Sequence, residues 1–202
     1  MKILKKSFKK ILAFLLVAVM VLSVSPIDSI SEIDFSSLFS IKAAAITSGK
    51  FTYELSGTNA TITGYSGTDS NLTIPSKLDG NTVVAIKHGV FANNADLVSV
   101  SLPGTLTSIG YHNTSYDGTF QNCKKLQTVT FSEGSAEAVI GSEVFMGCLS
   151  LKTVSIPGNY TTIRRDAFNG CTSLKSFEWK KSSSSTPNQT IEQGVFAACS
   201  SL

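Results

Sequence analysis

Apolar residues recur at fixed distances from five phenylalanines in residues 81–202. Three residues after each phenylalanine comes a cysteine, or an asparagine in the first copy, and six residues after it comes a leucine in every copy. Nine and eleven residues after it, four copies carry two apolar residues separated by one polar residue. Five residues before it stands an isoleucine in every copy except the second, which has an insertion at residues 111–118. The two columns used below are Phe91, Phe120, Phe145, Phe168 and Phe196, and Cys123, Cys148, Cys171 and Cys199.

The spacing of these columns predicts the fold. An apolar–polar–apolar pair has the alternation of a β-strand, so both apolar side chains are expected to point into a core. Phenylalanine, cysteine and leucine at three-residue spacing fit a helical or 3-10 turn that packs back on this strand. The phenylalanines are 29, 25, 23 and 28 residues apart, and one such unit cannot bury its own apolar face. We therefore predict an α/β-type solenoid, a coil of stacked repeats with a parallel sheet on one face and short helical or 3-10 returns.

Residues 46–80 lack the phenylalanine, cysteine and leucine columns. Apolar and polar residues alternate in the segments FTYEL and ATITGY, which predicts strands with glycine-rich turns between them. A solenoid needs an atypical first unit over its open end. We predict a small β-rich N-terminal cap over residues 46–80 and the repeat array over residues 81–202. The last repeat is truncated at Leu202, so we expect the chain to be a fragment of a longer protein.

The first 45 residues have the pattern of an export signal. Five lysines precede an apolar run of 14 residues from Ile11 to Val24, which is shorter than the ~20 residues of a stable membrane-spanning helix. This arrangement is typical of a secretory signal peptide. Ala43-Ala44-Ala45 supplies the small residues of a cleavage site, and Ser23-Val24-Ser25 is a rival site. We predict a signal peptide and leader over residues 1–45, with a retained membrane anchor as the alternative.

The net positive charge of the chain comes from this first segment. Of 17 basic and 14 acidic residues, residues 1–45 hold six lysines and three acids, which leaves 11 of each sign (17 − 6 and 14 − 3) in residues 46–202. The cap and array are thus formally neutral. We expect no nucleic-acid partner, and contact with a membrane only through the export signal.

The repeat columns resemble the BspA-like leucine-rich repeats of bacterial surface proteins. The resemblance covers roughly residues 70–202 and rests on the strings GVFANNADLVSVSLP, GTFQNCKKLQTVTF, EVFMGCLSLKTVSIP and DAFNGCTSLKSFEW, followed by GVFAACSSL. It implies a leucine-rich-repeat coil that is secreted or held at the cell surface. It also implies a role in adhesion, with an extracellular protein or glycan on host or neighbouring cells as the partner.

The cysteine column has two readings. Disulfides are allowed in an exported chain, and neighbouring rungs ~5 Å apart lie within the Cα reach of one. The cysteine spacings equal the repeat period, however, so the side chains are expected to run parallel into the core. We predict buried thiols that pack as small apolar groups, with disulfides as the alternative. The chain has no CxxC pair, so we expect no metal site.

Catalytic motifs are missing from the sequence. Neither a nucleophile elbow, a metalloprotease motif nor a nucleotide-binding loop is present. The histidines are His88, before a predicted return, and His112, in the insertion, where we interpret the polar and aromatic neighbours as a solvated loop. We expect no catalytic residue, no cofactor and no enzyme activity.

One row of residues is a candidate binding face. The residues eight and ten positions after each phenylalanine are expected to point out of the coil, and seven of these eight are serine or threonine. Such residues suit a solvated sheet, but they also form a flat hydrogen-bonding surface flanked by Lys152 and Lys175. We call this row the hydroxyl strip; it consists of Ser99, Ser101, Thr128, Thr130, Thr153, Ser155, Ser176 and Glu178.

The leading functional hypothesis is an exported recognition module that binds a macromolecule on host or neighbouring cells through this strip. The alternative is a structural spacer or targeting arm of a larger surface protein whose active domain lies beyond Leu202.

Overall fold

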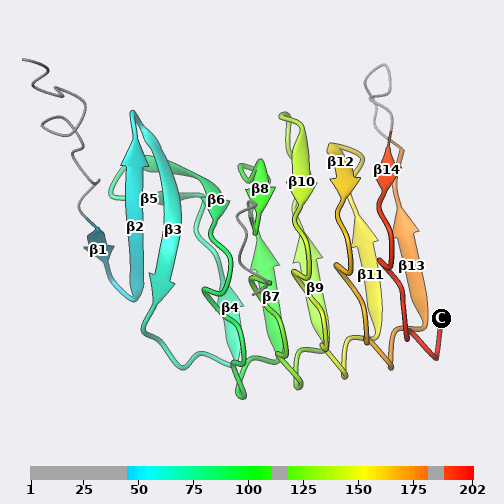
Figure 1. The fold of residues 1–202 in the computed structure, drawn as a ribbon. Coiled ribbons are helices and arrows are strands. Elements are labelled where there is room, and N and C mark those ends of the chain that lie inside the picture. The colour runs from blue at the N-terminus through cyan, green and yellow to red at the C-terminus, as the bar shows by residue number, and fades with distance from the viewer. Residues whose placement is uncertain (1–44, 111–117, 182–188) are drawn as a thin grey trace, which may run out of the picture. The chain divides into compact units, whose positions relative to one another are not determined.

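The computed structural model describes residues 45–110, 118–181 and 189–202. Residues 45–202 belong to one compact unit, in which strands of successive repeats lie side by side in two sheets (Figure 1). The five-stranded sheet holds the strands made by the apolar–polar–apolar pairs. All its strands are parallel, in the order β4-β7-β9-β11-β13. Their bounds are β4 Asn71–Thr73, β7 Ser99–Leu102, β9 Thr128–Phe131, β11 Thr153–Ile156 and β13 Ser176–Trp179.

The nine-stranded sheet runs along a second side of the coil, in the order β1-β2-β3-β6-β8-β10-β12-β14, with β5 paired to β6. Its first three strands are antiparallel, and parallel pairing begins between β3 and β6. The repeat columns predict only one sheet, whereas the isoleucine column forms this second one. The bounds are β1 Ile46–Ser48, β2 Phe51–Ser56, β3 Asn59–Tyr65, β5 Lys77–Leu78, β6 Asn81–Ile86, β8 Ser108–Ile109, β10 Ala138–Ile140, β12 Tyr160–Ile163 and β14 Thr190–Ile191.

Apolar side chains from the two sheets meet inside the coil. The valines of β7, β9 and β11 are buried from one side and the isoleucines of β8, β10 and β12 from the other. The leucines six positions after Phe91, Phe120, Phe145 and Phe168 are 0% exposed. Each rung therefore shares its core with the next rung, and the predicted solenoid is confirmed. The buried columns are Val100, Val129 and Val154; Ile109, Ile140 and Ile163; and Leu97, Leu126, Leu151 and Leu174.

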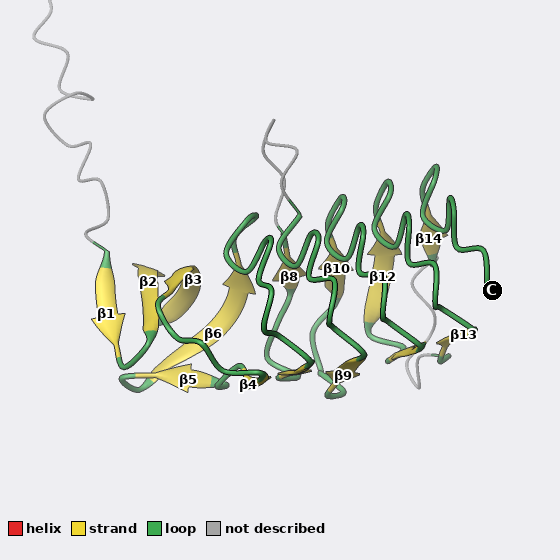
Figure 2. Ribbon diagram, turned by 90° about the horizontal axis from the view of Figure 1, so that it is seen from below, coloured by secondary structure: helices red, strands yellow, loops and turns green. Residues whose placement is uncertain are grey.

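The return segments are successive turns, and the expected helical returns are absent from the described residues. Figure 2 shows the turns of successive coils side by side. Their amides alternate between two acceptors: the amide of Phe120 donates to Val144 of the next coil at 2.8 Å, and the amide of Gln121 donates back to Gly118 at 3.1 Å. The amides of Asn122 and Cys123 repeat this alternation. Because every second amide is used between coils, a continuous intrasegment ladder cannot form. Within the described ranges no helix is long and apolar enough to cross a membrane.

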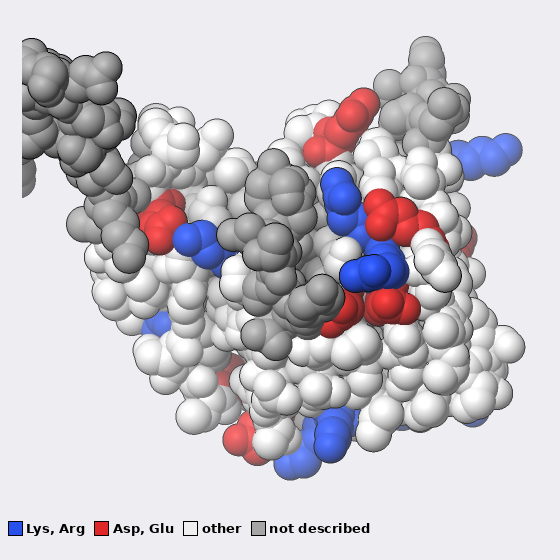
Figure 3. Space-filling view, in the orientation of Figure 1, with Lys and Arg blue, Asp and Glu red and all other residues white. Residues whose placement is uncertain are grey.

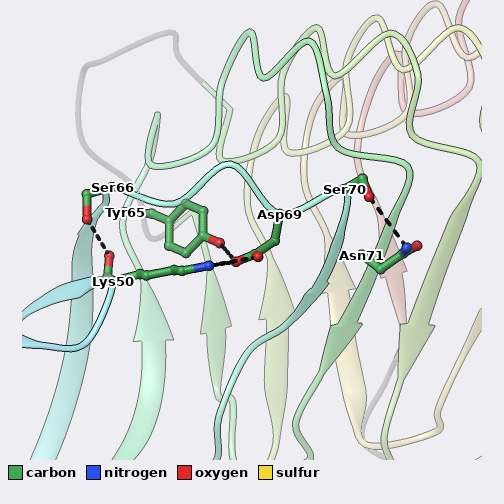
Figure 4. Close-up of polar contacts among 6 residues, drawn as sticks. All are labelled: Lys50, Tyr65, Ser66, Asp69, Ser70 and Asn71. Atoms are coloured by element: carbon green, nitrogen blue, oxygen red, sulfur yellow. Dashed lines mark hydrogen bonds and ion pairs between the residues drawn. The ribbon is translucent and has the colours of Figure 1, made fainter.

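The phenylalanine column forms a stack along the coil axis. Rings of successive coils are nearly parallel, with centroids 4.9 to 5.9 Å apart. Tyr65 of β3 continues the stack beyond Phe91, at 5.2 Å and a tilt of 54°. The hydroxyl of Tyr65 donates to Asp69, which also binds the ammonium of Lys50 at 2.7 Å (Figure 4). Phe51 of β2 packs on Tyr65 in turn, with ring centroids 5.1 Å apart, so two aromatic residues of the first strands extend the column.

Three segments lie outside the described residues. These are the predicted signal peptide and leader up to residue 44, residues 111–117 with His112, and residues 182–188. The division of the chain at residues 45/46 and 80/81 stays a prediction.

Candidate functional site

The five-stranded sheet brings the hydroxyl strip together in two rows. Ser99, Thr128, Thr153 and Ser176 are paired neighbours across β7, β9, β11 and β13. The second row follows two residues later on each strand, with Ser101 beside Thr130 and Ser155 beside Glu178. All the strip residues are exposed except Ser99, which is half-buried. Alternation along each strand explains this placement, since the intervening residues fill the core.

β4 lengthens the strip by two residues that the repeat columns do not identify. Asn71 lies beside Ser99 and Thr73 beside Ser101, and both are exposed. The hydroxyl of Ser99 donates to Asn71 Oδ1 at 2.7 Å, and the hydroxyl of Ser155 donates to Glu178 Oε2 at 2.8 Å. The remaining exposed hydroxyls keep donors and acceptors available to a ligand. The alternating sequence NLT of β4 is the signal that could have revealed these two residues.

The strip is interrupted by a hollow between β9 and β11. β7 and β9 share four residue pairs, as do β11 and β13, whereas β9 and β11 share only Thr128 with Thr153. A hollow of about 380 Å³ opens there, lined by Thr130, Phe131, Ser155 and Lys180 together with Val129, Glu133, Thr153 and Pro157. Its size lies at the lower end of small-ligand pockets, which range over roughly 300–1,000 Å³.

Pro157 lies at this opening. The residues that follow β9 and β13 are Ser132 and Lys180, whose amides donate to Leu102 and Ile156 of the preceding strand, each at 2.9 Å. Pro157 follows β11 at the equivalent position and has no amide hydrogen to donate to Phe131. Phe131 is half-buried, like Trp179 on the edge strand, whereas Leu102 and Ile156 are buried.

A second concavity lies on the nine-stranded sheet. The residue after each isoleucine of this sheet forms an outer row of Lys87, Gly110, Gly141, Arg164 and Glu192. The two glycines leave a gap between side chains, and a groove of about 630 Å³ opens over them. A β-carbon on Gly141 would approach the carbonyl oxygen of Gly110 to 2.1 Å, so close backbone contact requires glycine there.

The charges around this groove are already paired. Lys87 binds Glu54 at 2.9 Å, and Arg164 lies 3.7 Å from Glu192. Basic and acidic side chains intermingle on the face viewed in Figure 3. Although the groove is the larger of the two concavities, its lysine and its arginine already contact carboxylates. The hydroxyl strip with its hollow is therefore the stronger candidate site.

The described residues include histidine, cysteine and carboxylate side chains that could take part in chemistry. Among them, no three histidine, cysteine or carboxylate side chains gather into a metal site. Burial raises the pKa of the Cys123 thiol to about 11 and that of Cys171 to about 12, which disfavours the nucleophilic thiolate. His88 lies at the groove of the nine-stranded sheet, away from the hydroxyl strip.

Comparisons with known proteins agree with this architecture. The model of the family described as BspA type Leucine rich repeat region (6 copies) matches residues 25–116 and 84–202. No curated protein matches the chain. A leucine rich cell surface protein from Faecalibacterium prausnitzii A2-165 is similar in structure, with 25% identity and a TM-score of 0.54 over 79% of this chain and 53% of its own. The chain thus spans about half the length of that protein.

Two further crystal structures show the same fold at lower identity. A leucine-rich repeat protein from Bacteroides capillosus ATCC 29799 has 22% identity and a TM-score of 0.56 over 67% of this chain and 98% of its own. The pneumococcal vaccine antigen PcpA has 19% identity and a TM-score of 0.57 over 74% of this chain and 40% of its own.

Proposed function

Because the chain belongs to the BspA-type leucine-rich repeat family, we propose that it is an exported binding module whose hydroxyl strip contacts a macromolecule on host or neighbouring cells. The similar protein from F. prausnitzii is described as a cell surface protein, which supports an extracellular location. The cationic and apolar start of the sequence supports export in the same way. The proposed role is recognition without chemical conversion of the ligand.

The observation that carries the proposal is the register of the strip. Exposed hydroxyls recur in two rows across neighbouring parallel strands, at the ~4.8 Å spacing of a sheet. A rigid sheet holds them in place before binding, so little conformational entropy is lost when a ligand arrives. Each hydrogen bond contributes only about 0.5–1.5 kcal/mol, and several bonds made at once give a useful affinity.

The test compares two sets of hydroxyl deletions on the same fold. Purified protein is titrated onto intact host cells and onto immobilised extracellular-matrix components. In the strip variant, Thr128→Val, Thr130→Val and Thr153→Val remove hydroxyls while keeping side-chain shape and strand propensity. The matched control carries Thr162→Val and Thr190→Val, neighbours on β12 and β14 of the other sheet. We expect the strip variant to bind about tenfold more weakly or worse and the control to bind like the unmodified protein.

Two outcomes would count against this proposal. Equal binding by all three proteins would place the contact elsewhere on the coil. No saturable binding by folded, unmodified protein would favour the alternative role of a spacer or targeting arm in a larger surface protein.

A further inference from the structure

Charge pairing differs sharply between the two sheets. Four of the five basic residues on or next to the strands of the nine-stranded sheet are within 4 Å of a carboxylate; these four are Lys50, Lys87, Arg164 and Arg165. Lys77 of β5 is the fifth. The strands of the other sheet are bordered by six lysines, and in the described part of the chain only Lys125 is paired, with Asp96 at 3.7 Å. The formal neutrality of residues 46–202 therefore conceals an uneven distribution of unpaired cations.

The five unpaired lysines lie at the two ends of the strands that carry the hydroxyl strip. Lys152 and Lys175 immediately precede β11 and β13, and Lys180 immediately follows β13. Lys180 also lines the hollow beside Thr130. The remaining two are Lys124 and Lys181, and all five side chains are exposed.

Acidic groups on this side are fewer than the lysines. Glu178 lies within the strip, where it accepts a hydrogen bond from the Ser155 hydroxyl, and Glu133 lines the hollow. Together with Asp96 they set three negative charges against six lysines, a difference of three positive charges (6 − 3). A ligand that lies along this face therefore meets a positive potential together with rows of hydroxyls.

The uncharged part of the face indicates the class of ligand. Protein hot spots are enriched in exposed tryptophan, tyrosine and arginine, and the strip contains none of these residues. Its hydroxyls act as both donors and acceptors, which suits a ligand that is itself rich in hydroxyls. The half-buried ring of Phe131 gives the hollow an apolar wall, so a sugar ring can enter it while its substituents meet Thr130, Ser155 and Lys180.

We propose that the five-stranded sheet binds a linear acidic polysaccharide, with its sulfate or carboxylate groups at the lysines and its sugar hydroxyls on the hydroxyl strip. This inference rests on the proposed function, because it names the ligand class of the same site. A linear polymer matches the face since lysines and hydroxyls recur from strand to strand. Binding through exposed lysines is screened by salt, because the Debye length falls from ~10 Å at 0.1 M to ~3 Å at 1 M.

The experiment measures binding of the purified protein to immobilised heparin, chemically desulfated heparin, neutral dextran, polyphosphate and a glycan-free matrix protein. One variant carries Lys152→Gln and Lys175→Gln. The matched control carries Lys77→Gln and Arg165→Gln, which remove two exposed cations next to strands of the other sheet. A third protein carries the strip substitutions Thr128→Val, Thr130→Val and Thr153→Val. Circular dichroism checks that all are folded.

We expect heparin binding that falls about tenfold or more in the lysine variant and in the strip variant, persists in the control and weakens with salt. Dextran is expected not to bind. The polysaccharide inference would be overturned if the protein bound a glycan-free matrix protein and this binding were lost in the strip variant but kept in the lysine variant. The proposed function would then still stand. Equal losses in the lysine variant and its control, or equal binding of polyphosphate and heparin, would show unspecific charge attraction and overturn the inference. Cell binding that no strip substitution affects would overturn the proposed function itself.

Discussion

The thiol of Cys148 donates a hydrogen bond to the carbonyl oxygen of Phe120, one coil earlier, at 3.2 Å. The other three cysteines make the same bond to the phenylalanine of the preceding coil, at 3.1 to 3.2 Å. All four are free thiols. In the first copy Asn94 stands in place of cysteine, and its Oδ1 instead accepts the amides of Asp96 and Leu97 within its own coil. The column therefore supplies a hydrogen-bond donor as well as a small apolar group.

This bond predicts an unusual order of stability among Cys148 variants. Cys148→Ala removes the donor and leaves a small cavity, so the free energy of unfolding should fall by about 1–3 kcal/mol. Cys148→Ser keeps a donor of similar size and should cost less than Cys148→Ala. Urea unfolding followed by circular dichroism measures both. A larger loss for serine than for alanine would show that the thiol acts only as an apolar filler, because a buried hydroxyl without a bond is costly.

The left-handed turn two residues after each phenylalanine gives a second prediction. This position holds Gly147 at φ +71°, and a β-carbon there would lie 2.4 Å from Asn122 Oδ1. Gly147→Ala should lower the free energy of unfolding by about 1–2 kcal/mol through backbone strain, with little added by the overlap, because the end of the Asn122 side chain can turn aside. The matched control is Gly80→Ala, since Gly80 has φ +84° but nothing within 4 Å of its added β-carbon. It should cost only the ~1–2 kcal/mol of backbone strain. A loss at Gly147 well above that at Gly80 would show that the Asn122 side chain cannot turn aside.

The contacts of Asp69 predict how stability depends on pH. Hydrogen bonds from Lys50 and Tyr65 hold the pKa of Asp69 below its ordinary value of 3.8. A depressed carboxyl pKa contributes stability that is present above the ordinary pKa and is lost as pH falls through the folded-state value. Melting temperature should therefore fall as pH is lowered from 3.8, and Asp69→Asn should reduce this dependence. The pH dependence of Tyr65→Phe, which loses one of the two donors, should lie between those of the unmodified protein and Asp69→Asn. If the melting temperature of Asp69→Asn still fell below pH 3.8 as steeply as that of the unmodified protein, this assignment would be wrong.

The sequence predicts the coil because its strongest signals are core columns, which are repeated in every rung. It predicts the placement of the hydroxyl strip for the same reason, since the strip alternates with buried valines. The returns, predicted as helical or 3-10, are series of turns in the described residues, and three-residue spacing fits either form. The difference lies in bonds such as that from the amide of Phe120 to Val144, 24 residues away (144 − 120), which no local pattern reveals.

The repeat columns could not predict the second sheet and the two concavities, for related reasons. The isoleucine column marks strands as short as Thr190–Ile191, too short to show alternation. The groove depends on Gly110 and Gly141 being neighbours across β8 and β10, which requires the register of the sheet. The hollow lies where Pro157 has no amide hydrogen to donate, a difference that becomes visible only when the residues after β9 and β13 are compared with it.

Pro157 also allows the hollow to be tested without removing any hydroxyl of the strip. In Pro157→Ser the new amide can donate to the carbonyl of Phe131, as the amides of Ser132 and Lys180 do on neighbouring strands. We expect β11 to pair with β9 over its full length and the hollow of about 380 Å³ to close. The added hydrogen bond of about 0.5–1.5 kcal/mol offsets the ~0.4–1 kcal/mol lost with the rigid proline, so stability should change little.

Amide hydrogen exchange and heparin binding measure the two consequences of this substitution. Residues of β11 should exchange more slowly than in the unmodified protein, because their amides join a longer ladder. Heparin affinity should fall although the strip and all five unpaired lysines are intact, since a sugar ring can no longer reach Phe131. Slower exchange with unchanged heparin affinity would mean that the polysaccharide lies on the flat part of the strip. Unchanged exchange would show that something other than the missing amide of Pro157 separates β9 from β11.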